Sequence, residues 1–190
     1  MGVDRARIER AVAELLSAIG EDPARPELVD TPRRVADAYQ EFFAGIDVDP
    51  LGHLAETVPL DGGKSDTVIV RGLRFRSICE HHLLPFIGVA HLAYLPSDRI
   101  VGLGRLGRVV ETLAARPQLQ ERLTEQIADT LVDGLDPRGV LVVLDAVHGC
   151  VTTRDLRQTG SSTVTIVARG LFVEPERRAE MMALIGATRD

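Results

Sequence analysis

Each of the two cysteines of this chain lies close to a histidine in the sequence. Cys79 and His82 form a C-x-x-H pair, and Cys150 follows His148 by two residues. A tight turn in a C-x-x-H segment can present a sulfur and an imidazole to one metal ion, and Cys150 would supply a third soft ligand from a distant segment. Three protein ligands with one open position are typical of catalytic zinc, whereas structural zinc usually has four ligands. The spacing therefore favours a catalytic zinc (Zn²⁺) site.

Two other fates of these cysteines stay open on sequence alone. A disulfide is one, but no signal peptide is recognisable, and a reducing cytosol favours metal over a bridge for cysteines beside histidines. Buried apolar thiols are the other, and this is the commonest fate of free cysteine. The long separation does not exclude a metal site. Closing a loop of about 70 residues costs roughly 4 kcal/mol, and a small zinc site supplies about 10–16 kcal/mol.

A second candidate site lies at residues 102–107, which read G-L-G-R-L-G. This matches the dinucleotide-binding pattern, but that pattern also requires a following parallel strand ending in an acidic residue, and here a second helix is predicted instead. Arg105 and Arg108 fall in the first turn of a predicted helix, where positive side chains oppose the helix dipole unless an anion compensates. An anion site and two solvated arginines are equally compatible with this pattern.

The composition limits the classes of function. A net charge of −6 over 190 residues gives no basic footprint for nucleic acid. No apolar run reaches membrane-spanning length. An apolar content of 45% can supply a core, which branched aliphatic residues must fill because aromatic residues are few. We expect a cytoplasmic protein that binds neither nucleic acid nor membrane.

The elements that must position these residues follow from periodicity. Helical patterns are predicted near residues 5–19, 31–44, 105–116, 118–135 and 175–185, and strand patterns at 67–70, 73–78, 89–95, 140–147 and 163–172. Residues 46–65 read as irregular. Strands, then two helices, then strands predict an α+β fold with a mostly antiparallel sheet. We therefore expect an N-terminal helical extension and connector at 1–65 and a catalytic domain at 66–190.

Taken together, these segments resemble the GTP cyclohydrolase I family. The resemblance covers nearly the whole chain, and its specific motifs are C-E-H-H at 79–82, Q-E-R-L at 120–123 and H-G-C at 148–150. It also includes T-P-R-R-V at 31–35, G-S-S-T-V-T at 160–165 and R-G-L-F at 169–172. The resemblance implies the tunnelling fold, an antiparallel sheet with two helices packed on one face, here preceded by N-terminal helices. It also implies hydrolysis of GTP to 7,8-dihydroneopterin triphosphate and formate, the first step of pteridine and folate synthesis.

The family's functional residues correspond to positions of this chain. Cys79, His82 and Cys150 match the zinc ligands, and His81 and His148 match the acid–base histidines. For His81, an orienting role beside a ligand stays open. The guanine edge would be received by Glu121, with Gln120 lining the same pocket. The positions that match or lie near the family's triphosphate contacts are Arg34, Arg105, Arg108 and Arg154. Family members assemble as two pentameric rings with active sites between subunits, so a homodecamer is expected.

Three departures from the family pattern fall at the phosphate end. Gly104 and Arg105 stand where serine and lysine are common, and Asp155 follows Arg154 where glycine is usual. They leave two alternatives open: a non-catalytic paralogue that binds a purine or pterin, and a related cyclohydrolase with a shifted substrate in secondary metabolism. The ligand set suits zinc, and iron(II) is the other candidate.

Overall fold

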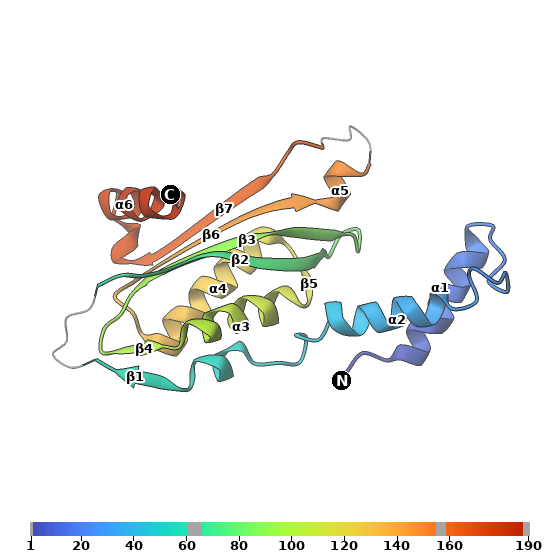
Figure 1. The fold of residues 1–190 in the computed structure, drawn as a ribbon, viewed down its shortest axis with the longest axis horizontal. Coiled ribbons are helices and arrows are strands. Elements are labelled where there is room, and N and C mark those ends of the chain that lie inside the picture. Colours follow the sequence, from blue (N-terminus) through green and yellow to red (C-terminus); the bar gives the residue numbers. More distant parts are fainter. Residues whose placement is uncertain (1, 61–65, 155–158, 188–190) are drawn as a thin grey trace.

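The computed structural model describes residues 2–60, 66–154 and 159–187 (Figure 1). Asp155, one of the three departures from the family pattern, lies outside these residues. The helices are α1 (Arg5–Ala18), α2 (Thr31–Phe42), α3 (Leu103–Ala114), α4 (Gln120–Leu135), α5 (Gly149–Thr152) and α6 (Pro175–Gly186), with 3₁₀ turns at Pro50–Leu54 and Leu171–Val173. The strands are β1 (Thr57–Pro59), β2 (Val68–Cys79), β3 (Pro85–Leu95), β4 (Arg99–Val101), β5 (Pro117–Gln118), β6 (Gly139–His148) and β7 (Thr163–Gly170).

One five-stranded sheet, in the order β5-β2-β3-β6-β7, organises the molecule. Its neighbours are antiparallel except for the short parallel pair of β2 with β5. The predicted α+β class with a mostly antiparallel sheet is therefore confirmed. The two segments expected at 67–70 and 73–78 form one strand, β2, with an irregularity between Val70 and Leu73 where Gly72 has a φ of 72°. Residues 57–59, expected to be irregular, pair with β4 as a separate two-stranded sheet.

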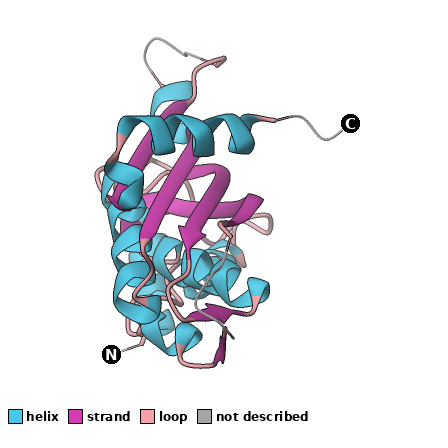
Figure 2. Ribbon diagram, turned by 90° about the vertical axis from the view of Figure 1, so that its left-hand side faces the viewer, coloured by secondary structure: helices cyan, strands magenta, loops and turns pink. Residues whose placement is uncertain are grey.

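The two faces of the sheet bury different side chains. Val140, Val142 and Leu144 of β6 belong to the main core, whereas Leu141 and Val143 between them belong to a second cluster with α6. This alternation follows from the two-residue period of a strand. Helices α3 and α4 cover the main face, which confirms the two expected helices, and α6 crosses the strands on the opposite face (Figures 1 and 2).

The helices on the main face are placed by their apolar stripes. In α4, Leu123, Ile127 and Leu131 recur every four residues and are fully buried. Burying one such side chain contributes roughly 1.5–3 kcal/mol. Helix α4 ends where Asp136 adopts a left-handed φ of 45° and its N–H bonds to Val132. The packing of α3 and α4 fixes the strand ends that carry the candidate site.

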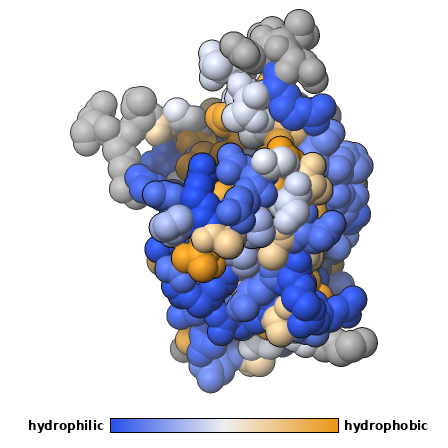
Figure 3. Space-filling model, turned by 90° about the vertical axis from the view of Figure 1, so that its right-hand side faces the viewer, coloured by the Kyte–Doolittle hydropathy of each residue, from blue (hydrophilic) through white to orange (hydrophobic). Residues whose placement is uncertain are grey.

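Helices α1 and α2 pack on each other as an arm that extends from the sheet (Figure 1). Viewed from the arm, the surface is mainly hydrophilic (Figure 3). Within the described residues, none of the helices combines the length and apolar character needed to cross a membrane. The division of the chain between residues 65 and 66 stays a prediction, and residues 61–65 lie outside the described residues.

Candidate active site

Three potential metal ligands converge at one end of the sheet. The ligand atoms of Cys79, His82 and Cys150 all lie within 4.8 Å of one another. Cys79 ends β2 and is buried, His82 lies exposed in the following turn, and Cys150 lies in α5 directly after β6. Strand β3 pairs with both β2 and β6, so the register of the sheet brings together residues that are distant in the chain.

The turn that carries His82 is closed by two backbone hydrogen bonds. The Cys79 N–H donates to Leu84 O, and the Leu83 N–H donates to Cys79 O, both at 2.9 Å. Leu83 adopts a left-handed φ of 53°, a conformation that costs a non-glycine residue roughly 1–2 kcal/mol. The two bonds and the packing of β2 on β3 hold this strained backbone, which positions His82 beside the cysteines.

The donor set fits a metal ion. Both cysteines are free thiols, and burial together with the neighbouring Cys79 sulfur raises the pKa of Cys150. The Cys79 sulfur disfavours ionisation of Cys150, and a divalent cation bound by both sulfurs would reverse that effect. Two thiolates and an imidazole are the soft ligands that zinc accepts. The convergence of an imidazole on both sulfurs supports the metal site over a disulfide or simple apolar burial.

His148, the last residue of β6, is held on two sides. Its ring stacks on Phe86 with a centroid distance of 4.7 Å and an interplanar angle of 4°. Its Nε2 lies 2.7 Å from Oε1 of Gln120. Burial lowers the pKa of His148, and the Glu121 carboxylate acts in the opposite direction. The lowered pKa favours a neutral imidazole near pH 7, which can accept a proton.

The other expected residues of this region are also near the cluster. His81 is exposed, and its ring lies edge-on to His82 at 6.3 Å. Glu121 lies in the first turn of α4 and acts electrostatically on His148. Arg154 similarly acts on Cys150. Gln120 is almost fully buried, and its amide is bonded to the sheet and to His148.

An ion pair between Glu80 and Arg122 borders the cluster and was not predicted from the sequence. Arg122 donates to the Glu80 carboxylate and also to Gln118 Oε1 at 3.1 Å. The hydrogen bond from Arg122 lowers the pKa of Glu80. Both residues belong to the motifs C-E-H-H and Q-E-R-L, so their presence in two site motifs was the available signal.

The three other arginines expected to bind triphosphate do not lie at the metal cluster of this chain. Arg105 and Arg108 line a cavity of about 490 Å³ with His53 and residues 102–104, and Arg105 pairs with Glu56. The residues of this cavity lie at the start of α3, whereas Cys79 pairs with Gln118 just after the C-terminal end of that helix. Arg34 lies on the arm and pairs with Asp30 at 3.4 Å. A single chain therefore does not bring these three arginines to the metal cluster.

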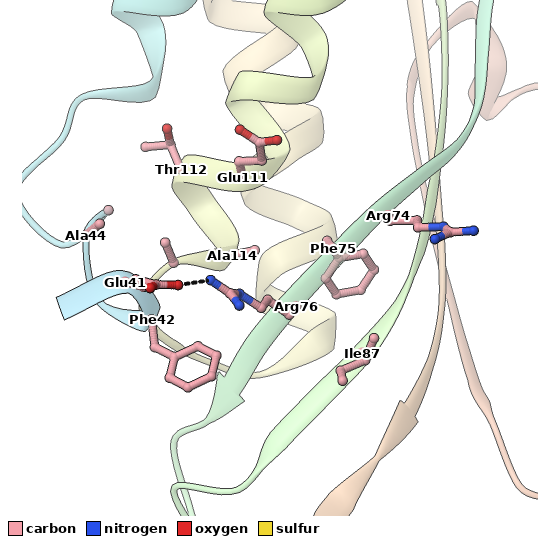
Figure 4. Close-up of a pocket in the computed structure, with 12 residues that line it drawn as sticks. Glu41, Phe42, Ala44, Arg74, Phe75, Arg76, Ile87, Glu111, Thr112 and Ala114 are labelled. Atoms are coloured by element: carbon pink, nitrogen blue, oxygen red, sulfur yellow. Dashed lines mark hydrogen bonds and ion pairs between the residues drawn. The ribbon is translucent and has the colours of Figure 1, made fainter. Parts of the chain in front are cut away.

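Another cavity, of about 580 Å³, lies between the end of α2, the end of α3 and strand β2 (Figure 4). Arg76 pairs with Glu41 at 2.8 Å there and lies over the ring of Phe42. The metal cluster does not line it. Its position beside β2 places it at one edge of the sheet.

The mostly antiparallel sheet with two helices on one face, and the Cys-Cys-His cluster at its end, define an α+β protein with a candidate metal site. A sequence model of GTP cyclohydrolase I matches residues 8–186, so this chain belongs to the GTP cyclohydrolase I family.

Similar sequences agree with this assignment. GTP cyclohydrolase 1 of Leifsonia xyli is 65% identical over 97% of each chain. The enzyme of that name from Rhodopirellula baltica is 52% identical over 96% of this chain and 80% of its own. The one from Carboxydothermus hydrogenoformans is 52% identical over 97% of this chain and 96% of its own. Among solved structures, a QueF-like archaeosine synthase (14% identity, 97% of that chain) and Escherichia coli dihydroneopterin aldolase (18%, 100%) each superimpose on 56% of this chain with a TM-score of 0.44.

Proposed function

We propose that this chain is a zinc-dependent, cytoplasmic GTP cyclohydrolase I, which converts GTP to 7,8-dihydroneopterin triphosphate and formate at the start of pteridine synthesis. The observation that carries the proposal is the convergence of Cys79, His82 and Cys150 within 4.8 Å, in a chain of this family. The neighbouring residues complete the chemistry. His148 lies two residues before Cys150, and the Glu121 carboxylate acts electrostatically on it.

Each residue of the site has a chemical task under this proposal. Cys79, His82 and Cys150 would hold the zinc. When bound, zinc supplies a water molecule activated for attack at neutral pH. The Glu121 carboxylate accepts two parallel N–H donors from the guanine edge, which selects guanine over adenine. His148 and His81 move protons while the ring opens and formate leaves. Arg154, close to Cys150, binds triphosphate oxygens.

We further propose that a second copy of the chain supplies the other triphosphate contacts. Arg105 and the C-terminal end of α3 are nine residues apart, which is about 14 Å of helix. The outer edge of β7 is unpaired within the described residues, as is most of the outer edge of β2. Val164 and Ile166 of β7 are 53% and 46% exposed. Pairing of β7 with β2 of another copy would satisfy the backbone groups of both edges and close the sheets into a ring, with Val164 and Ile166 together on one face of it. Such rings, paired as a homodecamer, would place Arg105, Arg108 and Arg34 at a neighbouring site.

The catalytic proposal is tested by incubating the zinc-loaded protein with GTP. We expect formate release, a fluorescent pterin after oxidation, and loss of both in Cys150→Ser. Metal analysis of the same sample distinguishes zinc from iron. Ligand-dependent thermal stabilisation by GTP with no turnover would instead identify a non-catalytic binding paralogue. Turnover of another purine with none of GTP would identify a shifted substrate.

The shared site is tested by mixing two inactive variants. In a shared site, Arg108→Ala removes the triphosphate contact that one copy supplies, and Cys150→Ser removes the metal ligand that the other copy supplies. Random pairing in co-assembled oligomers then leaves about one quarter of the sites intact, so up to about one quarter of wild-type turnover should return. His82→Ala with Cys150→Ser is the matched control, because both substitutions damage the same cluster and no mixed site is intact. Absence of recovery in the first mixture would place the whole site in one chain.

A further inference from the structure

The side-chain amide of Gln120 has a defined direction. Its Nε2 lies 2.8 Å from Thr163 O and 3.2 Å from both Leu144 O and Thr165 Oγ1. Backbone carbonyl oxygens only accept hydrogen bonds, so the NH₂ end of the amide must face the sheet. Oε1 of Gln120 must then face His148.

A pair of threonine hydroxyls supports the same direction. Thr124 Oγ1 donates to the backbone oxygen of Gln120 at 2.7 Å and lies 2.6 Å from Thr165 Oγ1. Each hydroxyl has one proton, so Thr165 must donate to Thr124 and can accept from Gln120. Turning the amide over would place its oxygen against two carbonyl oxygens in a buried site. Gln120 is 1% exposed, and such unsatisfied buried groups are costly.

The direction of the amide determines which ring nitrogen of His148 carries a proton. Because Oε1 of Gln120 is an acceptor only, Nε2 of His148 must carry a proton across the 2.7 Å contact. The parallel stack on Phe86 fixes the plane of the ring. A half-turn of the ring within that plane would replace Nε2 by the carbon Cε1 and lose the bond to Gln120.

We propose that Gln120 is a positioning residue, whose amide oxygen accepts the Nε2–H of His148 and so fixes both the tautomer and the orientation of that ring. The role of His148 in catalysis rests on the proposed function. The inference assigns the Gln120 amide to the histidine, whereas the family resemblance implied only that Gln120 lines the guanine pocket beside Glu121. It also gives the threonine pair a task, since these hydroxyls fix the amide that fixes the ring.

The tautomer is measurable without any turnover. In the zinc-loaded, full-length protein with ¹⁵N-labelled histidine, long-range ¹H–¹⁵N correlations distinguish the two neutral tautomers, and comparison with His148→Gln assigns the signal. We expect Nε2–H. An Nδ1–H tautomer would overturn the proposal whether or not the protein turns over GTP. If the wild type releases no formate, the proposed function is wrong, and this measurement still decides the inference.

Kinetics test the positioning role. Gln120→Ala should lower kcat by about 10-fold or more and change KM by less than about 2-fold, as expected for loss of a residue that orients a catalytic group. In a His148→Ala background the same substitution should cause no further loss. Gln126→Ala is the matched control, because Gln126 lies on the same helix and bonds to Gln118 instead, and we expect wild-type kcat. A rise in KM that persists in the His148→Ala background would show that Gln120 contacts guanine and would refute the proposal.

Discussion

Gly88 is a position where one added carbon should destabilise this protein strongly. It lies in β3 opposite Ala146 of β6. A Cβ built at Gly88 would lie 2.1 Å from Asp145 O and 2.6 Å from the Ala146 Cβ. Both neighbours belong to β6, which β3 and β7 hold from either side. The strand cannot move away without breaking part of its ladder.

The magnitude of the Gly88→Ala effect follows from this rigidity. Overpacking a core costs about 1–3 kcal/mol, and more where the neighbours are fixed. We therefore expect a loss of about 3 kcal/mol, which for a chain of this size lowers the Tm by roughly 6–12 °C. Phe86 is two residues along β3 and stacks on His148, so the same displacement disturbs the active site. Turnover of GTP should fall at temperatures well below the new Tm.

The assay is thermal unfolding of zinc-loaded protein, followed by circular dichroism at one protein concentration. Gly107→Ala is the control, because its Cβ would lie 3.8 Å from the nearest atom, Leu73 Cδ2, inside helix α3. Alanine favours a helix over glycine by about 1 kcal/mol, so this variant should melt roughly 2–4 °C higher. A Gly88→Ala protein that melts within about 2 °C of the wild type would refute the predicted overlap.

Three further predictions concern the metal, pH and the end of β2. Adding zinc at about 100 times its Kd should stabilise the wild type by about 2.7 kcal/mol, which raises its Tm. Cys150→Ala should abolish this rise in Tm. An equal rise in the variant would exclude Cys150 as a ligand. Burial, and next the charge of Arg71, lower the pKa of His91 in the folded protein, while Asp145 opposes them. Because the unfolded state binds the proton of His91 more readily, the free energy of unfolding should fall as pH drops below about 6.5. Between pH 7.5 and 5.5, the Tm of His91→Gln should therefore fall less than that of the wild type. An equal fall would show that the pKa of His91 is not lowered by folding. Ser77→Ala should lower the free energy of unfolding in urea by only about 1 kcal/mol. The reason is that Ala114 O loses the hydrogen bond from the Ser77 hydroxyl but keeps the one from the Arg116 N–H. A loss above about 3 kcal/mol would show that this second bond does not compensate.

The sequence predicted elements well where a local pattern determines them. The four-residue repeat of α4 and the long apolar segment of β6 were recognised because periodicity alone specifies them. The start of β3 was missed, since Gly88 was interpreted as a strand boundary. In the structure that glycine lies inside the strand, where close approach to β6 leaves no room for a side chain. Such a role depends on the neighbouring strand and has no local signal.

The residues of the site also differ in how far local sequence predicts them. The C-x-x-H turn is local, so Cys79 and His82 could be paired by spacing alone, and Cys150 was added by its residue type. The bond between Gln120 and His148 joins residues 28 positions apart on a helix and a strand. Nothing in the order of residues shows that these two side chains meet, because their meeting depends on how α4 packs across β6.

The arrangement of charges along α3 connects the fold to the proposed assembly. The metal cluster adjoins one end of this helix, and Arg105 and Arg108 lie at the other, where helix dipole and side chains together favour an anion. If one chain formed the whole site, the positive end of the helix would lie far from the substrate that needs it. If neighbouring chains share the site, the same arrangement gives each substrate a metal from one copy and a cationic pocket from the next. Assembly and catalysis would then depend on the same sheet edges, so a substitution that prevents pairing of β2 with β7 should abolish turnover while metal binding persists.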